Sequence, residues 1–342
     1  MEDKKIILDV KKLNTSFKSD GQLIKIIKDV SFQLEKGRSL AIVGESGCGK
    51  SVTVHSITRL MAKNAVISSD HVIYRSYRNS EEPREYRIDQ MSNYGKDMRS
   101  LRGPEISMVF QDPMASLNPV YRVGDQIIES LLEHNRGMSK KEAMEKAIEM
   151  LKKLGIPAPE QRVRDYPYQL SGGMKQRIVI AIAMINDPEL IIADEPTTAL
   201  DVTIQAQIME LMKKLQTDYN KSIILITHNM GLVTEMADDV IVMYMGRIME
   251  KGSLRQIFAS PSHPYTKMLL SSVPVLGLEQ GQKLTTIPGS TPNPADLKEG
   301  CEFAGRCPFC TDACLKGRIP GFETEEGHTV RCLRYAGSKE VD

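Results

Sequence analysis

A glycine-rich octapeptide constrains the fold of this chain more than any other feature: Gly44-Glu45-Ser46-Gly47-Cys48-Gly49-Lys50-Ser51. It follows an apolar run, Ser39 to Val43, that is typical of a buried strand, and precedes a stretch from Lys50 to about Met61 that we expect to be helical. The order strand, glycine loop, helix is the context that confirms a G-x-x-x-x-G-K-[ST] pattern. The sequence therefore predicts an α/β fold built around a phosphate-binding loop.

The loop provides groups that suit the phosphates of ATP or GTP. Its backbone N–H groups can surround phosphate oxygens, and the following helix adds the positive end of its dipole. We expect Lys50 to reach the β- and γ-phosphates and Ser51 to offer its hydroxyl to Mg²⁺. Cys48 needs to supply only its N–H group, so a redox role for this thiol is the weaker alternative. The expected nucleotide contacts are Gly44, Glu45, Ser46, Gly47, Cys48, Gly49, Lys50, Ser51 and Val52.

Apolar runs elsewhere alternate with helical patterns, as in an α/β fold. Glu105 to Phe110 is an expected strand, and Leu190 to Ala193 and Ser222 to Ile226 are expected central parallel strands. A helix starting near Asp201 separates the last two, which implies a right-handed crossover. Helices fill the interval from about 112 to 170, including one that begins at a capping box on Ser139. This helical block is expected to be an insertion between strands.

Three other regions have less regular patterns. Residues 68–102 are polar, with charges concentrated at Glu81 to Glu85, and are expected to form a surface loop with little structure. Residues 239–251 resemble a short hairpin around Gly246. Beyond Pro261, Pro and Gly are frequent up to about Gly300, a composition typical of a linker or an irregular small domain.

Polar side chains at strand ends supply a candidate hydrolytic site. Asp194 ends an apolar strand, so its carboxylate should emerge at the carboxyl edge of the sheet, where it can hold Mg²⁺. Glu195 is expected to point to the other side of an extended chain and to act as a base toward the attacking water. Gln111 and His228 also close apolar strands, and their roles depend on lying at the same edge.

Composition and charge narrow the classes of partner. Of the 342 residues, Lys and Arg number 45 and Asp and Glu 44, which argues against nucleic acid as the main partner. No apolar run is long enough to span a membrane, and the N-terminus lacks the apolar stretch of a signal peptide. We therefore expect a cytosolic chain.

Several motifs, in this order and spacing, resemble those of ATP-binding cassette (ABC) ATPases. Gly44–Ser51, Gln111, Leu170-Ser171-Gly172-Gly173, Asp194-Glu195, Ala199-Leu200-Asp201 and His228 resemble the Walker A, Q-loop, signature, Walker B, D-loop and switch-histidine motifs. The resemblance implies a P-loop NTPase cassette over about residues 1–260, with a RecA-like lobe, an antiparallel β part and an inserted α-helical subdomain at about 112–170. Residues 261–342 would form a small, irregular, Cys-rich C-terminal extension.

The resemblance also implies that two cassettes pack head to tail. Ser171, Gly172 and Gly173, at the start of a helix, would then contact an ATP held by the other chain. Phe17 resembles the aromatic residue that stacks on adenine, although a lone Phe is more often part of a core. The other implied assignments are catalytic Glu195, His228 and Gln111, nucleotide contact Asp201, and Mg²⁺ ligands Ser51, Gln111 and Asp194.

Three segments resemble the oligopeptide/dipeptide importer subfamily, which also includes nickel importers: Val109 to Pro119, Glu195 to Thr203 and His263 to Thr266. This implies an ATPase, peripheral on the cytoplasmic side of the cell membrane, that powers import of di- or oligopeptides. Its partners would be two integral membrane permease subunits, a second ATPase subunit, identical or related, and an extracytoplasmic solute-binding protein. The alternatives are an importer of nickel or another small solute and a soluble cassette protein acting on ribosomes or DNA.

Cysteines crowd the C-terminal residues. In a reducing compartment this spacing suggests metal ligands before disulfides, and both Zn²⁺ and an iron–sulfur cluster fit it. In the subfamily that the chain resembles, four cysteines can hold a [4Fe–4S] cluster, and the match falls on Cys301, Cys307, Cys314 and Cys332. Cys310 is an extra thiol that could compete as a ligand, and unligated buried thiols are the remaining alternative.

Overall fold

A computed structural model describes residues 4–19, 21–78, 80–198, 200–272, 287–297 and 299–341. These residues form two compact units. The first contains the residues up to Leu8, Leu34–Arg38 and Tyr74–Ile226, and the second contains Asp9–Gln33, Ser39–Ile73 and the residues from Thr227 onward. This division does not correspond to a cassette at residues 1–260 followed by an extension, so that predicted domain boundary stays a prediction.

The first unit contains three of the predicted parallel strands. They are β7 (Ile106–Val109), β8 (Leu190–Asp194) and β9 (Ser222–Thr227), in the order β7-β8-β9. Every residue of β8 and β9 is buried, which explains why their sequences are continuous apolar runs rather than alternating ones. Helix α8 (Val202–Thr217) connects β8 to β9 and starts at the predicted place, with Asp201 as its N-cap.

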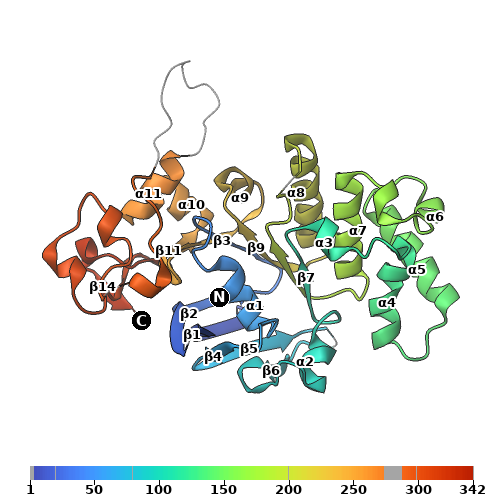
Figure 1. Ribbon diagram of the computed structural model, residues 1–342, viewed down its shortest axis with the longest axis horizontal. Helices are drawn as coiled ribbons and strands as arrows, with labels where there is room; N and C mark the ends of the chain where they lie inside the picture. Colours follow the sequence, from blue (N-terminus) through green and yellow to red (C-terminus); the bar gives the residue numbers. More distant parts are fainter. Residues whose placement is uncertain are drawn as a thin grey trace, which may run out of the picture. The chain divides into compact units, whose positions relative to one another are not determined.

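The inserted helices also lie in this unit and gather together, in green in Figure 1. They are α3 (Pro113–Ser116), α4 (Val123–His134), α5 (Lys140–Lys153), α6 (Pro159–Arg162), η2 (Pro167–Gln169) and α7 (Gly172–Met184). Ser139 caps α5 by accepting a hydrogen bond from the Glu142 N–H group. Gly155 follows the helix with φ +70°, a left-handed conformation that glycine adopts without strain.

The expectation of a poorly structured loop at residues 68–102 is wrong. The segment contains β5 (His71–Ser76), β6 (Arg84–Arg87), η1 (Ile88–Gln90) and α2 (Lys96–Leu101). The reason is a set of apolar side chains spaced among the charges, of which Tyr74, Ile88 and Met98 are fully buried. The Tyr74 hydroxyl lies 3.1 Å from a Glu105 carboxylate oxygen, so this buried ring also has a polar partner.

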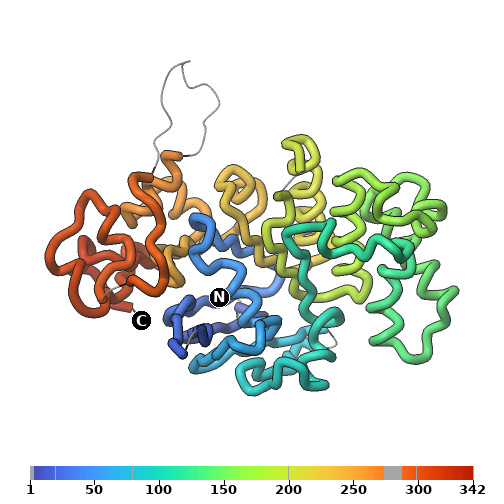
Figure 2. The backbone as a smooth tube through the Cα atoms, viewed as in Figure 1, coloured from blue at the N-terminus to red at the C-terminus, as the bar shows by residue number. Residues whose placement is uncertain are grey.

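The second unit contains a mixed sheet. Its strands are β3 (Ser39–Val43), β10 (Asp239–Tyr244), β11 (Arg247–Ser253), β13 (His328–Val330), β12 (Gly321–Glu325) and β14 (Lys339–Val341), in that spatial order. β3 and β10 are parallel, and the later pairs are antiparallel. The predicted hairpin around Gly246 is therefore confirmed, and Figure 2 shows how the C-terminal residues, in red, return to it.

The same unit holds β1 (Ile6–Ser19) and β2 (Gln22–Glu35) over most of their length, and β4 (Ala65–Ser68), which pairs with β1. Helix α1 (Lys50–Ile57) ends four residues earlier than expected, and Arg59 beyond it has φ +57°. The other helices are α9 (Met230–Met236), α10 (Leu254–Ala259), α11 (Pro264–Ser271), η3 (Pro294–Asp296), η4 (Ala304–Arg306), η5 (Asp312–Leu315) and η6 (Leu333–Tyr335). The expected linker beyond Pro261 thus begins with a helix; its residues 273–286 lie outside the described residues.

Aromatic rings join the C-terminal residues to the core of this unit. Tyr244 of β10, Tyr265 of α11 and Phe303 are all fully buried. The Tyr244 ring centroid lies 4.8 Å from that of Tyr265 and 5.3 Å from that of Phe303, distances at which aromatic pairs attract. The C-terminal extension therefore shares a hydrophobic core with β3 and β10.

No helix in the described ranges is long and apolar enough to cross a membrane.

Candidate functional site

The predicted phosphate loop connects β3 to α1. Gly44, Gly47 and Gly49 have φ values of +151°, +77° and +103°, and a side chain on Gly44 would collide with the Met243 carbonyl. The Lys50 ammonium donates hydrogen bonds to the carbonyl oxygens of Gly44 at 2.8 Å and Glu45 at 3.0 Å. The loop thus curves around the end of its own lysine side chain, the residue that reaches the β- and γ-phosphates in this motif.

Side chains from farther along the chain brace the loop. The Arg306 guanidinium donates to both carboxylate oxygens of Glu45, at 2.6 and 3.0 Å. The Glu45 N–H group donates to the Tyr265 hydroxyl at 2.8 Å, and Arg306 also donates to the Tyr244 hydroxyl at 3.3 Å. Hydrogen bonding to Glu45 raises the pKa of Arg306 above its usual value, so this guanidinium stays charged. Sequence reasoning missed Arg306, Tyr244 and Tyr265 as parts of the site.

Four other predicted site residues lie in the second unit: Cys48, Phe17, Val52 and His228. Cys48 is buried, and burial raises the pKa of its thiol, which favours the structural interpretation over a redox role. Phe17 is half-buried on β1 opposite Ala65, and Val52 is half-buried on α1. His228 is exposed directly after β9.

The predicted carboxylates lie in the first unit, where β8 ends. Asp194 is buried and Glu195 is half-buried. The Gln111 amide donates to a Glu195 carboxylate oxygen at 3.0 Å, and the Thr198 hydroxyl donates to the same oxygen at 3.0 Å. The structure therefore brings together Gln111 and Glu195, as predicted, and adds Thr198, which sequence reasoning did not identify.

The expected extended conformation of Glu195 is wrong. Its φ is +47°, in the left-handed region, and its N–H group donates to the Ile226 carbonyl of β9 at 2.9 Å. A non-glycine residue in this region costs on the order of 1–3 kcal/mol, and such strain is concentrated at functional sites. The turn that follows β8, rather than strand alternation, determines where this carboxylate points.

The signature residues begin helix α7 in the first unit. The Ser171 hydroxyl accepts a hydrogen bond from the Met174 N–H group at 3.3 Å, and Gly172 and Gly173 form the first turn. A Cβ on Gly173 would lie 2.9 Å from the Ile204 side chain of α8, so only glycine allows this approach. Asp201 accepts from the Ile204 N–H group at 3.0 Å as the cap of α8. Ala199, which precedes it, lies outside the described residues.

Four of the C-terminal cysteines line one small cavity. They are Cys301, Cys307, Cys314 and Cys332, the four that the resemblance selects. Cys310 is exposed and does not line the cavity. Burial raises the pKa of Cys301 to about 12. Within the described ranges, no group of three or more His, Cys, Asp or Glu residues converges on one point as the ligands of a single metal ion do.

Comparison with known proteins identifies the family. Residues 27–198 match the ABC transporter family, and residues 249–314 match the oligopeptide/dipeptide transporter C-terminal region. The chain belongs to the ABC transporter family. It is an ATP-binding cassette and an ATPase, so the cassette fold and the nucleotide expected from the phosphate loop are confirmed.

Relatives of this ABC cassette match it over nearly its whole length. A putative peptide import ATP-binding protein of Brucella ovis is 47% identical, with 96% of this chain and 97% of the relative covered. The dipeptide transport ATP-binding protein DppD of Bacillus subtilis is 47% identical, with 95% of this chain and 94% of DppD covered. The oligopeptide transport ATP-binding protein AppD of the same organism is 45% identical over 96% of this chain and 97% of its own.

A solved structure supports the cassette fold. The ATP-binding cassette MJ0796, as a dimer in a post-hydrolysis state bound to ADP and phosphate, matches with a TM-score of 0.61 and 27% identity. The match covers 72% of this chain and 99% of the MJ0796 chain.

Replacing Arg306 tests the brace on the phosphate loop. Arg306→Met is expected to weaken ATP binding about tenfold, or about 1.4 kcal/mol, because Glu45 loses the partner that holds the loop. Calorimetric titration with ATP in the presence of Mg²⁺ measures this change. Arg306→Lys keeps the positive charge but not the bidentate geometry, so its ATP affinity should lie between those of the unmodified chain and Arg306→Met. Exposed Arg255→Met is the control, and equal affinity in Arg306→Met and Arg255→Met would contradict the role of the brace.

Proposed function

We propose that this ABC cassette is the ATP-hydrolysing subunit that powers import of di- or oligopeptides across the cytoplasmic membrane through partner permease subunits. One observation carries the proposal: relatives named for peptide, dipeptide or oligopeptide import are 45–47% identical over at least 95% of the chain. The match of residues 249–314 to a C-terminal region named for the same solutes supports it.

The predicted site residues take complementary roles in this proposal. Lys50 and the N–H groups of the phosphate loop bind the β- and γ-phosphates. Ser51, Gln111 and Asp194 would hold Mg²⁺, which would neutralise phosphate charge. Glu195 accepts a proton from the attacking water, and His228 and Gln111 orient the reacting groups. The hydrogen bonds of Gln111 and Thr198 to one Glu195 oxygen fix the orientation of that carboxylate.

A second ATPase subunit completes the site. Ser171, Gly172 and Gly173 form the N-terminus of a 13-residue helix, where N–H groups and the helix dipole favour an anion. Their proposed ligand is the γ-phosphate of an ATP bound to the other subunit, with Asp201 beside it. ATP binding then closes the pair of cassettes, and hydrolysis and release open it, which drives the permeases between their two access states.

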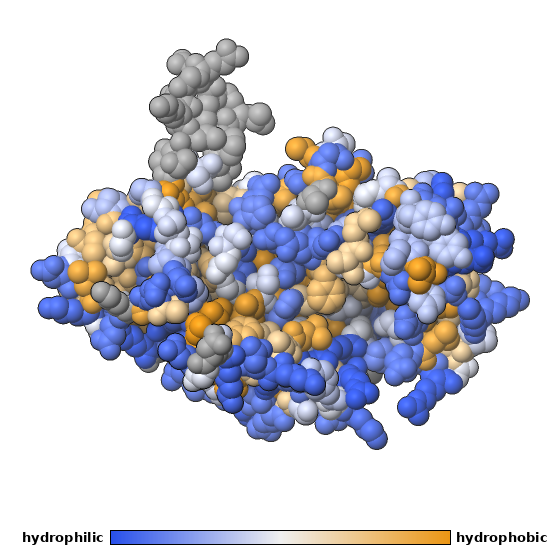
Figure 3. All heavy atoms as spheres, in the orientation of Figure 1, coloured by the Kyte–Doolittle hydropathy of each residue, from blue (hydrophilic) through white to orange (hydrophobic). Residues whose placement is uncertain are grey.

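Exposed apolar side chains on the helical insertion supply a surface for the permeases. Met114 of α3 and Tyr121 before α4 have exposed fractions of 62% and 59%, and Val120 between them has 72%. Figure 3 shows apolar side chains, in tan and orange, at the surface near α3. Adjacent exposed apolar residues of this kind mark protein interaction sites. A peripheral position on the cytoplasmic membrane face follows from this contact.

Capture of the partners tests the proposal. The tagged chain, produced in the cells that naturally contain it, is expected to purify with two integral membrane proteins, and cells with the complex should take up labelled dipeptides. Met114→Asp combined with Tyr121→Asp should abolish both results, whereas Tyr219→Asp, at an exposed tyrosine of the same unit, should not. Isolation with ribosomes, or uptake of nickel but not of peptides, would contradict the proposal.

We also propose that the cysteine cavity holds a [4Fe–4S] cluster through Cys301, Cys307, Cys314 and Cys332. A single Zn²⁺ ion, the alternative, would need these ligands to converge on one point. Each thiolate of such a cluster binds a different iron, so the four ligands surround a volume and need not converge on one point. The four side chains that line one cavity suit this arrangement. Cys310 is exposed and does not line this cavity, so we do not include it among the proposed ligands.

Replacing single cysteines by serine distinguishes the proposed cluster ligands from the extra thiol, Cys310. Chain purified without oxygen is expected to contain about four iron atoms and as many labile sulfides, as the cluster formula requires. Cys314→Ser should lose most of the iron, because a serine hydroxyl is a poor ligand, and Cys310→Ser should keep it. Equal iron in the two variants, or stoichiometric zinc in place of iron, would contradict the cluster.

A further inference from the structure

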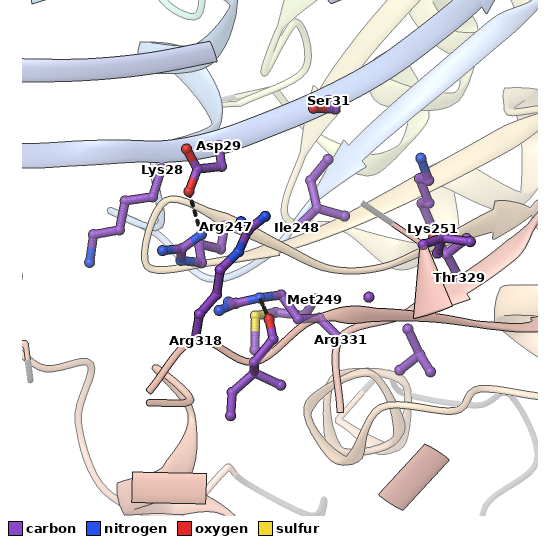
Figure 4. Close-up of a pocket in the computed structure, with 14 residues that line it drawn as sticks. Lys28, Asp29, Ser31, Arg247, Ile248, Met249, Lys251, Arg318, Thr329 and Arg331 are labelled. Atoms are coloured by element: carbon purple, nitrogen blue, oxygen red, sulfur yellow. Dashed lines mark hydrogen bonds and ion pairs between the residues drawn. The ribbon is translucent and has the colours of Figure 1, made fainter. Parts of the chain in front are cut away.

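The pocket of about 290 Å³ drawn in Figure 4 contains arginines that already have carboxylate partners. Arg247 donates to Asp29 at 3.1 Å, the bond that is dashed in Figure 4, and to Glu302 at 2.7 Å. Arg331 donates to Glu302 at 2.8 Å. These pairs join β2 and β11 to the C-terminal extension and serve the fold of the second unit. Polar contacts that bear on catalysis lie in the first unit, in the turn between β8 and α8.

Gln205, the fourth residue of α8, holds this turn by two hydrogen bonds. Its side-chain nitrogen Nε2 lies 3.1 Å from the Thr197 carbonyl oxygen and 3.1 Å from the Leu200 carbonyl oxygen. Both partners are acceptors, so the NH2 group of the amide, which has two N–H donors, must face them. One side chain therefore holds both ends of the 197–200 segment.

Apolar packing fixes this segment only in part. Thr197 is buried, but Thr198 and Leu200 are half-buried. The backbone hydrogen bonds of the turn are long, at 3.2 Å from the Thr198 N–H group to the Glu195 carbonyl and 3.3 Å from the Leu200 N–H group to the Thr197 carbonyl. The two bonds from the Gln205 amide therefore add to a turn that is weakly held by its own backbone.

The position of the 197–200 segment matters because Thr198 contacts the candidate base. The Thr198 hydroxyl donates to Glu195 Oε2 at 3.0 Å, and the Gln111 amide donates to the same oxygen at 3.0 Å. Thr198 lies between the two carbonyl groups that Gln205 holds, so a shift of the segment would move its hydroxyl and turn the carboxylate. A displacement of about 1 Å can cost a factor of about 10² in rate.

We propose that Gln205 is a positioning residue for ATP hydrolysis. By holding the 197–200 segment, it lets Thr198 keep the Glu195 carboxylate in the orientation that hydrolysis needs. The inference rests on the proposed role of Glu195 as the base. The described hydrogen bonds of Gln205 stay within residues 197–205, so its loss should change the rate of hydrolysis and not the binding of ATP.

Steady-state kinetics of the assembled transporter test the proposal. Gln205→Met keeps the length of the side chain and a good helix former but removes both donors. It is expected to lower kcat about tenfold with KM for ATP within about twofold, the pattern of an interaction that matters only in the transition state. Gln205→Lys should keep at least about half of the unmodified kcat, because an ammonium group can donate to two carbonyls, as Lys50 does in this chain.

A double substitution shows whether Gln205 acts through Thr198. Thr198→Val removes the hydroxyl that reaches Glu195. Residues that act as one unit have non-additive effects, so Gln205→Met combined with Thr198→Val should have a kcat within about twofold of the slower single variant. A kcat reduced by the product of the two separate losses would show that Gln205 acts elsewhere, and would overturn the proposal.

The matched control is Gln161→Met, at an exposed glutamine of α6 in the same unit, which should keep the unmodified kcat. If Gln205→Met does not fold, Gln205→Glu provides the same test, since it has the same shape and its carboxylate donates no hydrogen bond. An unchanged kcat, or a raised KM with kcat unchanged, would overturn the proposal.

The role of Glu195 is tested separately by Glu195→Gln. If Glu195→Gln loses turnover while Gln205→Met does not, the base stands and only the positioning role of Gln205 fails. If Glu195→Gln keeps its turnover, the proposed base is wrong, and the positioning role fails with it.

Discussion

Glu195→Gln is expected to lower ATP hydrolysis by the assembled transporter at least about 100-fold while ATP binding is retained. A general base contributes about 10² to 10⁴ in rate, and an amide cannot accept the proton of the attacking water. The substitution keeps the size of the side chain, and its amide oxygen can still accept from Gln111 and Thr198. Steady-state phosphate release and a calorimetric ATP titration measure the two quantities separately.

The control for this variant is Glu145→Gln, on the exposed face of α5 in the same unit. It removes the same charge and should keep the turnover of the unmodified complex. Hydrolysis within about fivefold of that complex in Glu195→Gln would show that another group takes the proton. Loss of ATP binding in Glu195→Gln would instead show that the side chain holds the loop or the metal.

Glu250→Gln is expected to lower the free energy of unfolding by about 1–3 kcal/mol, the usual cost of leaving a buried hydrogen-bonding group without its partner. Glu250 and His328 have side-chain exposures of 0% and 1%, and their Oε1 and Nε2 atoms lie 2.7 Å apart. The carboxylate also accepts from the N–H groups of Ser262 at 2.7 Å and His263 at 2.8 Å. A glutamine side chain has only one acceptor oxygen. Its NH2 group must therefore face at least one of these donors, which then loses its hydrogen bond.

Urea unfolding of the full chain measures this loss, with exposed Glu326→Gln as the control. The pH dependence provides a second measurement. Burial alone would raise the pKa of Glu250, but hydrogen bonding to His328 and to the two N–H groups outweighs it and holds the pKa below 4.5. The contribution of the ionised Glu250 to the free energy of unfolding is therefore complete above pH 4.5. It is lost as the pH falls through the lower pKa that Glu250 has in the folded chain. A loss under about 1 kcal/mol in Glu250→Gln would contradict the proposed energetic role.

Local sequence was sufficient for the parts of the site that depend on backbone shape. The phosphate loop follows from glycines at positions with positive φ, and the start of α5 follows from one capping residue, Ser139. Glu195 shows the limit of this reasoning. Because it follows a strand, an extended conformation was expected, but its N–H group pairs with the Ile226 carbonyl and its φ is +47°.

Contacts between distant segments were the part that sequence could not supply. No pattern near Glu45 indicates that an arginine from the C-terminal extension would bind it. The structure of residues 71–102 was missed for a related reason, since the charges at Glu81 to Glu85 obscure apolar side chains that are buried only by packing on other elements. The four cysteines were selected by resemblance, and their common cavity depends on the fold of the whole extension.

The brace between Glu45 and Arg306 joins residues 261 positions apart, which has a consequence for synthesis on the ribosome. At about 5–20 residues per second, the phosphate loop leaves the site of synthesis about 13 to 50 s before its partner is made. During that interval the nascent cassette already carries every glycine of the loop and its lysine, but not the arginine that holds Glu45. A chain terminated before Arg306 would keep the whole motif permanently in that unbraced form.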